Sequence, residues 1–146
     1  MILIGIDTLN TLPSNHFNNG LFESLKMGLI YDKQLFNVFK GNYQENIFEI
    51  VVKSIEIKKH FVELDEDDTG VRKVLNFGHT FGHAIESCSD FEILHGEAIA
   101  NGMLIASQGK PYVGDLKQIL LNMGCNIVSN LNEEKLMKFI KNDKKS

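Results

Sequence analysis

The sequence predicts a mainly α-helical domain that begins with one short strand. Three observations carry this prediction. Apolar residues recur with a helical period over most of the chain, and only two prolines, Pro13 and Pro111, interrupt it. The chain has 146 residues, of which 43% are hydrophobic, which is enough for the core of one domain and too little for two ordinary ones.

The strand is expected over residues 1–6, because MILIGI is too short and too apolar for a surface helix. A lone strand cannot satisfy its own backbone groups, so it should pair with something outside this sequence or fray. A loop rich in Thr, Asn, Ser and Gly follows. Helical periodicity starts near Leu21, breaks briefly at residues 32–33 and resumes over residues 34–40.

Five further helices are expected along the rest of the chain. They cover residues 46–61, 71–87, 97–108, 114–123 and 133–141. An acidic loop over residues 63–70 precedes the second of them. The inward side of the first is predicted to hold Ile47, Ile50, Val51, Ile55 and Phe61.

Composition argues against several classes of protein. The net charge is −4, so no broad basic surface is available for nucleic acid. No apolar run approaches the roughly 20 residues of a membrane span, and the first residues lack the features of a signal peptide. A cytoplasmic location is expected. Cys88 and Cys125 stand alone, which is typical of buried thiols in a reducing compartment.

A line of polar residues marks the segment RKVLNFGHTFGHAIE, residues 72–86. On a continuous helix Arg72, Asn76, His79 and His83 would fall within about 60° of arc. Two glycines inside such a helix each cost roughly 1 kcal/mol against alanine, which indicates that something approaches the backbone closely. The alternative is a solvated face whose glycines accommodate a neighbouring helix.

Histidines from this helix and His95, at the start of the next, have the composition of a metal site. Imidazole with a carboxylate suits Zn²⁺, Co²⁺ or Fe²⁺ better than Mg²⁺ or Ca²⁺. Spacing alone leaves open which histidines bind. Glu23 can supply the carboxylate, although its spacing from Lys26 is equally typical of a surface Glu/Lys pair. Lys58, beside Lys59, is likewise typical of a solvated charge run.

Two blocks on this segment resemble a known signature. RKVLNFGHTFGHAIES followed by LHGEAIANGM is similar to the signature of 3-dehydroquinate synthase and its sugar-phosphate cyclase relatives. Further stretches agree with the same family in their order and spacing: TLNTLP with GLFESLKMGLIYD, then IKKHFVELDEDDTGVR, and the final DKK. The resemblance covers nearly the whole chain, but only the C-terminal half of the family's enzymes.

The resemblance implies a role for each matching residue. The metal ligands would be Glu23, His79 and His95. The catalytic residues would be His83, which is associated with proton transfer, together with Lys58 and Asp68. The substrate contacts would be Lys26, Arg72, Asn76 and either Lys144 or Lys145. Thr8, Leu9, Asn10 and Thr11 would lie along NAD.

The family converts 3-deoxy-D-arabino-heptulosonate 7-phosphate to 3-dehydroquinate and phosphate, in the shikimate route to aromatic amino acids. The implied cofactors are Zn²⁺, with Co²⁺ as an alternative, and NAD. The resemblance also implies a homodimer. Residues 1–19 would be the last strand and linker of a missing dinucleotide-binding domain, and residues 20–146 a helical domain truncated at its end. Without that NAD-binding domain the chain is expected to be inactive.

Some residues depart from the family pattern. Asp68 stands where Glu is usual, Phe22 and Asn101 replace residues that are commonly smaller or apolar, and residues 104–113 look shortened. Two alternatives therefore remain. One is a cyclase that makes a different carbocycle, although Arg72 and Asn76 together favour a substrate with a carboxylate. The other is a degenerate, non-catalytic helical fragment.

Overall fold

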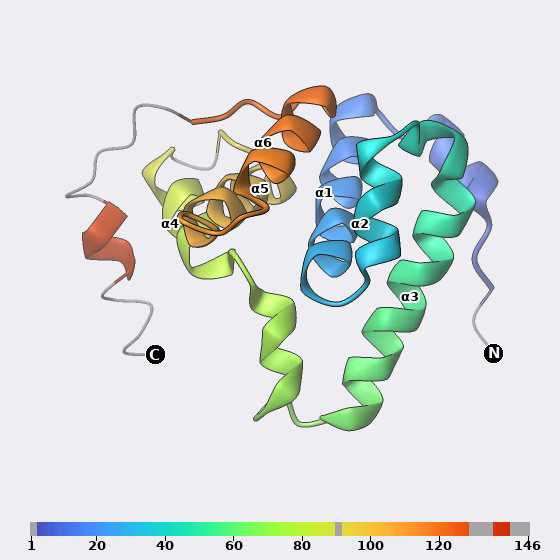
Figure 1. The fold of residues 1–146 in the computed structure, drawn as a ribbon, viewed down its shortest axis with the longest axis horizontal. Helices are drawn as coiled ribbons and strands as arrows, with labels where there is room; N and C mark the ends of the chain where they lie inside the picture. The colour runs from blue at the N-terminus through green and yellow to red at the C-terminus, as the bar shows by residue number, and fades with distance from the viewer. Residues whose placement is uncertain (1–2, 90–91, 129–135, 141–146) are drawn as a thin grey trace.

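A computed structural model describes residues 3–89, 92–128 and 136–140, and these form a helical domain (Figure 1). The α-helices are α1 (Ser14–Ile30), α2 (Lys33–Lys40), α3 (Ile47–Leu64), α4 (His79–Cys88), α5 (His95–Ala106) and α6 (Val113–Asn122). Three 3-10 helices are η1 (Ile6–Thr11), η2 (Tyr43–Asn46) and η3 (Val71–Asn76). The predicted helical class is confirmed.

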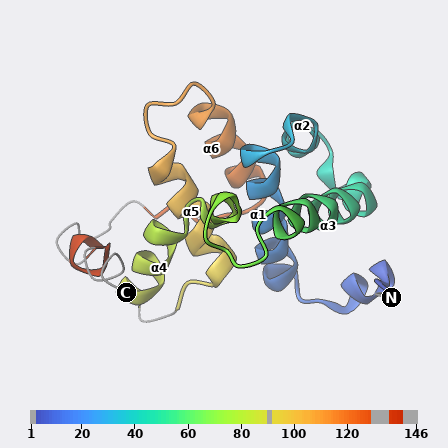
Figure 2. The same ribbon diagram turned by 90° about the horizontal axis from the view of Figure 1, so that it is seen from below.

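Helices α1 and α5 form the centre of the molecule. Helix α1 packs against α2 and α3 on one side and against α5 on the other, while α4 packs against α5 (Figures 1 and 2). Side chains from these layers make the main core, and its fully buried members include Leu25, Leu35, Ile50, Ile99 and Leu116. The core therefore lies where the two groups of helices meet.

The strand expected over residues 1–6 is wrong for the part that the structure describes. Residues 3–5 have no regular structure, and Ile6 already belongs to η1. Leu3 is 84% exposed. The physical reason is that the described residues contain no neighbouring strand that could satisfy the backbone groups of this segment. Met1 and Ile2 lie outside the described residues.

Helix α1 begins at Ser14, seven residues before the helical period becomes visible in the sequence. Its first two turns are polar, but their side chains make long-range contacts. Asn18 donates to the carbonyl of Met123, and the side-chain oxygen of Asn19 accepts from the amide of Glu97. Tertiary contacts thus stabilise a helical segment whose local pattern resembles a loop.

The next two helices follow the prediction closely. Asp32 caps α2, because its Oδ1 accepts hydrogen bonds from the amides of Gln34 and Leu35 at 2.8 and 3.1 Å. Helix α3 buries Ile50 and Phe61 as expected. Ile55 is 41% exposed, however, so its predicted inward position is wrong, and Ile57 takes a buried position instead.

The continuous helix expected over residues 71–87 is also wrong. The segment forms η3, turns at Phe77 and Gly78, and starts again as α4. Gly78 has a φ of +82°, which a helix does not contain and which glycine adopts most readily. A side chain there would also meet Met103 of α5 at 2.8 Å. The turn therefore lets the chain change direction where it touches α5.

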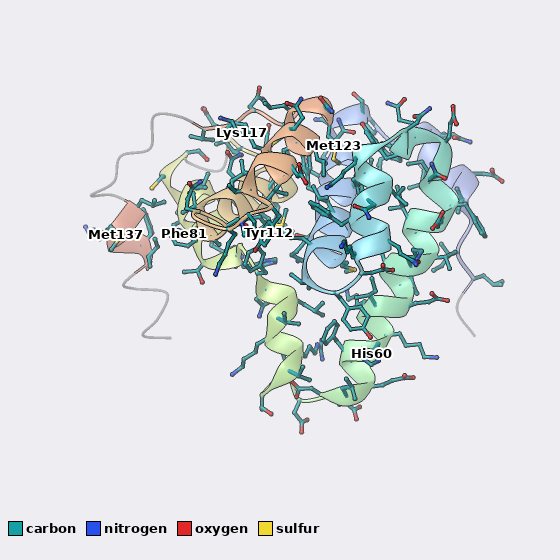
Figure 3. All side chains as sticks on the ribbon, viewed as in Figure 1. His60, Phe81, Tyr112, Lys117, Met123 and Met137 are labelled. Carbon is teal, nitrogen blue, oxygen red and sulfur yellow. The ribbon has the colours of Figure 1, made fainter. Side chains whose placement is uncertain are left out.

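Helices α5 and α6 lie close to their predicted positions. Residues 136–140 are helical, as expected, and the rest of the predicted helix over 133–141 lies outside the described residues. Leu136 and Ile140 pack with α4, where Phe81 lies on the side facing this segment (Figure 3). Cys125 is buried, and burial raises the pKa of its thiol to about 12.

No helix among the described residues is long and apolar enough to cross a membrane. This finding agrees with the apolar runs in the sequence, all of which are short.

Candidate metal and substrate site

Three potential metal ligands converge from three helices. Glu23 lies in the middle of α1, while His79 and His95 are the first residues of α4 and α5. One donor atom of each lies within 4.8 Å of the others. Two imidazoles and a carboxylate at this separation fit the donor set of a three-ligand zinc site, which keeps further positions for substrate.

Glycines allow this convergence, because they bring helix backbones into direct contact. A Cβ on Gly96 would collide with the backbone carbonyl of Asn19, so the start of α5 is pressed against α1. A Cβ on Gly102 would collide with the carbonyl of Gly78 and lie 2.7 Å from the amide nitrogen of Gly82. Gly78 and Gly82, which the sequence pattern singled out, likewise face Ile99 and Met103 of α5. A close backbone approach is therefore found, but what approaches is a neighbouring helix, as the alternative interpretation of these glycines expected.

The Glu23 carboxylate is only half satisfied. Its Oε2 accepts from Lys26 Nζ at 2.6 Å, whereas Oε1 is buried and has no hydrogen-bond partner among the described residues. A buried carboxylate oxygen without a partner costs free energy unless a cation or hydrogen-bond donor reaches it. The residues present therefore fit a divalent cation between Glu23 and the two imidazoles.

His79 is held in the state that a metal ligand needs. Its Nδ1 lies 3.4 Å from the carbonyl of Phe77, which leaves Nε2 for another partner. Burial lowers the pKa of His79, the positive charge of Lys26 lowers it further, and Glu23 opposes both. The ring thus stays neutral to lower pH than a free histidine, and only a neutral ring binds a metal.

A cavity of about 200 Å³ opens beside these donors. Its lining residues come from α1, α3, the loop before η3, η3 itself and the start of α4: Glu23, Lys26, Met27, Lys58, Asp68, Arg72, Leu75, Asn76 and His79. Three of them are cationic, which suits an anionic ligand. Burial lowers the pKa of Lys26, an effect that the Glu23 carboxylate opposes and the Lys58 ammonium strengthens.

Predicted site residues are thus brought together although the predicted helix is broken. Arg72 and Asn76 lie on η3, and His79 lies beyond the turn, yet all three line the same cavity. Glu23 and Lys26 form an ion pair, as their spacing indicated, but Lys26 is buried, so the surface interpretation of this pair is wrong. Lys58 is exposed and still reaches the cavity.

Sequence reasoning missed the residue that shapes the loop before η3. The carboxylate of Asp65 accepts hydrogen bonds from the amides of Thr69, Gly70 and Arg72 at 2.8 to 3.1 Å. These bonds, that of the Arg72 amide most of all, hold the pKa of Asp65 below its usual value. Asp68 sits inside this loop with a φ of +54°. Three aspartates, Asp65, Asp67 and Asp68, precede the Thr-Gly pair at residues 69–70, so this turn signal does not single out Asp65.

A second missed residue is Glu86 of α4. Both of its carboxylate oxygens lie 3.2 Å from Nδ1 of His95. His83 is exposed and does not line the cavity described above, but its ring lies 5.5 Å from that of His79 and 5.9 Å from that of His95, centre to centre. A second set of possible ligand atoms, one each from His83, Glu86 and His95, also lies within 4.8 Å of one another.

The residues expected along NAD lie apart from this site. Thr8, Leu9, Asn10 and Thr11 belong to η1, which lies at the α3 edge of the molecule, on the opposite side from α4 (Figures 1 and 2). Both threonine hydroxyls donate to nearby backbone carbonyls. Lys144, with its neighbour Lys145, lies outside the described residues.

Comparisons with known proteins identify the family of this chain. Residues 20–146 match the family described as 3-dehydroquinate synthase C-terminal. A 3-dehydroquinate synthase of Clostridium perfringens is 40% identical over all of this chain and 46% of its own length, and one of Dictyoglomus thermophilum is 37% identical over 99% and 45%. The chain therefore spans about half the length of these curated relatives.

A solved structure shares the fold. ValA, the 2-epi-5-epi-valiolone synthase of Streptomyces hygroscopicus subsp. jinggangensis 5008 with NAD⁺ and Zn²⁺ bound, superimposes with a TM-score of 0.85 at 19% identity. The match covers 95% of this chain and 44% of ValA. With a family match that extends from α1 to the last residue, this chain belongs to the 3-dehydroquinate synthase family, as its C-terminal domain.

Proposed function

We propose that this chain supplies the cation-binding and substrate-binding half of a 3-dehydroquinate synthase active site. The substrate would be 3-deoxy-D-arabino-heptulosonate 7-phosphate, and the products 3-dehydroquinate and phosphate. The observation that carries the proposal is the convergence of Glu23, His79 and His95, with a buried Glu23 oxygen that lacks a partner, beside a cationic cavity.

Each part of the cavity has a chemical task in this proposal. A Zn²⁺ or Co²⁺ ion on Glu23, His79 and His95 would supply a Lewis acid for a substrate hydroxyl and its carbonyl. The guanidinium of Arg72 matches a carboxylate, and Lys26 and Lys58 add charge for a phosphate.

Two further residues would take part in proton transfer in this proposal. His83, whose ring lies beside those of His79 and His95, would act in proton transfer. Asp68, which reaches the cavity from the loop before η3, would act as a second acid or base. Its side chain is one methylene shorter than the usual glutamate.

The hydride acceptor belongs to another part of the proposed enzyme. NAD would be bound mainly by the part of the relatives' length that this chain does not span, with Thr8 to Thr11 as its contacts here. We therefore expect the 146-residue chain to bind metal and substrate without turnover. Further proposals carried by the family resemblance are Lys144 as a substrate contact, a homodimer and a cytoplasmic location.

Calorimetric titration of Zn²⁺ into the chain tests the metal site. We expect one ion to bind the unaltered chain, and binding to be lost in His79→Ala because one of three ligands is gone. His16→Ala is the matched control, since His16 is exposed and is not part of this cluster. Identical isotherms for the unaltered chain and His79→Ala would contradict the proposal.

A related cyclase that makes another carbocycle is the second candidate, supported by the fold shared with ValA. The two candidates differ in whether the substrate has a carboxylate. Arg72 and Asn76 in one cavity favour the carboxylate-bearing substrate. Binding of sugar phosphates with and without a carboxylate to the Zn²⁺-loaded chain distinguishes them, and Arg72→Lys should weaken only the former if the first candidate is right. A chain that binds neither metal nor sugar phosphate would instead be a non-catalytic fragment.

A further inference from the structure

We infer that Glu86 is a positioning residue that fixes the ring of His95 with Nε2 available to a cation. The inference deepens the proposed metal site and rests on it. Glu86 does not line the cavity, so it would act through His95.

The hydrogen bond determines where the proton of the ring lies. An ionised carboxylate has no hydrogen and can only accept, so the hydrogen between Glu86 and His95 must be on Nδ1. A neutral imidazole carries one such hydrogen, and Nε2 then presents a lone pair. A carboxylate behind a metal-ligating histidine orients the ring and raises its basicity.

Burial makes this contact stronger than an ordinary surface pair. The Glu86 side chain is 15% exposed, whereas that of His95 is 51% exposed and needs an external restraint. Within the described residues, no lysine or arginine lies within ion-pair distance of Glu86, and the His95 ring is the partner that the structure gives its carboxylate. The negative charge of Glu86 is therefore directed at this ring.

Glu86 also lies on the helix that supplies the other imidazole of the proposed metal site. It is on α4, as is His79, and α4 is packed tightly against α5, which begins with His95. The bond from Glu86 to His95 thus joins the two helices that supply the imidazole ligands. Any shift between α4 and α5 would change the separation of those ligands, and this bond opposes it.

A second cation held by His83, Glu86 and His95 is the competing interpretation, because these three also lie within 4.8 Å. Two observations favour positioning. Glu86 already has a hydrogen-bonded partner, whereas Glu23 has a buried oxygen without one. An ion bound through Nδ1 of His95 would also have to displace the hydrogen that this bond requires.

The ring can be examined directly in the metal-free chain by ¹⁵N NMR of the histidine side chains, at a pH where they are neutral. We expect His95 to carry its hydrogen on Nδ1, and Glu86→Ala to shift it toward Nε2. Glu86→Gln should keep the Nδ1 hydrogen, because the amide oxygen still accepts. Glu63→Ala is the matched control, since Glu63 is an exposed acid on α3. A His95 ring protonated on Nε2, or unchanged in Glu86→Ala, would overturn the inference.

Zinc titration of the same variants gives the second measurement. Loss of such a supporting carboxylate typically weakens metal binding 10–100-fold, so Glu86→Ala should fall in about that range and Glu86→Gln should be weakened less. A different outcome would overturn positioning in favour of a second site: the unaltered chain binds two ions, and Glu86→Ala loses one of them while its affinity for the other is unchanged. If the unaltered chain binds no Zn²⁺, the proposed function fails, while the NMR result still decides the role of Glu86.

Discussion

At the scale of single residues, Asn101 shows how a polar side chain can be buried in an apolar helix. It is 3% exposed on α5. Its amide nitrogen donates to the carbonyls of Glu97 and Asn126, and its oxygen accepts from the amide of Val128. The side chain therefore fastens the segment after α6 to α5 through two hydrogen bonds.

We expect Asn101→Ala to lower the free energy of unfolding by about 1–3 kcal/mol, because it removes the hydrogen bonds of a buried side chain to residues 97, 126 and 128. Urea unfolding followed by circular dichroism measures the change. The control is Asn122→Ala at the exposed end of α6, which should change stability by less than about 0.5 kcal/mol. Equal effects of the two substitutions would show that the Asn101 bonds contribute nothing.

Asp32 predicts a dependence of stability on pH. Burial alone would raise the pKa of this carboxyl, but hydrogen bonds from Leu35, Lys53 and Gln34 hold it below 3.8. A carboxyl with a depressed folded-state pKa stabilises the fold above its unfolded value, and that contribution is lost as pH falls through the folded-state pKa. Asn caps a helix as well as Asp does, so Asp32→Asn isolates the charge.

Thermal unfolding of Asp32→Asn at pH 3 and pH 7 tests this. We expect the unaltered chain to lose more stability between the two values than the variant does, since the variant has no charge to lose. Parallel losses would mean that Asp32 does not contribute to the acid sensitivity of the fold.

At the scale of elements, the contact between α4 and α5 depends on glycine. The neighbours of Gly102 are backbone atoms of Gly78 and Gly82, which cannot move aside as a flexible side chain can. Gly102→Ala should therefore push α5 away from α4 and separate His79 from His95. We expect a destabilisation of about 1–3 kcal/mol and weaker Zn²⁺ binding.

The matched control for this substitution is Gly114→Ala in α6. A Cβ there meets nothing within 4 Å, and the residue is helical with a negative φ. Alanine should raise stability by up to about 1 kcal/mol through its helix propensity, without any effect on Zn²⁺. Urea unfolding and calorimetry on both variants measure the contrast, and a Gly102→Ala chain as stable as the unaltered one would contradict the tight α4–α5 contact.

Periodicity predicted most helices but not the turn inside the residue 71–87 segment. A helical wheel assumes helical backbone at every residue, so it cannot show that Gly78 has a positive φ. It still placed Arg72, Asn76 and His79 on one side, and they do share a cavity, because η3 and α4 approach it from either side of the turn. The start of α1 was missed for the opposite reason, since contacts of Asn18 and Asn19 with distant segments stabilise it.

At the scale of the whole molecule, the site is a property of three helices that are far apart in the sequence. Spacing could not separate Glu23 from an ordinary surface glutamate, because the donors beside it, His79 and His95, come from helices far along the chain. The family resemblance supplied that residue. Neither approach found Asp65 or Glu86. Asp65 holds the loop before η3 by accepting from backbone amides, and Glu86 contacts the ring of His95. A residue that acts through a neighbour need not recur at a fixed spacing from the ligands, so the sequence pattern does not reveal it.

Because the three ligands join α1, α4 and α5, binding of a cation should stabilise the whole fold. Free Zn²⁺ at 100 times its dissociation constant adds about 2.7 kcal/mol to the free energy of unfolding of a one-site protein, provided that the unfolded chain does not bind it. At this chain length such a gain raises the melting temperature by several degrees. Ca²⁺ at equal concentration should have no such effect, since it prefers oxygen ligands. Differential scanning calorimetry with Zn²⁺, Ca²⁺ and a chelator measures the shift. His79→Ala should melt at the same temperature with and without Zn²⁺, and a Zn²⁺-dependent rise in that variant as large as in the unaltered chain would place the ion somewhere other than between these helices.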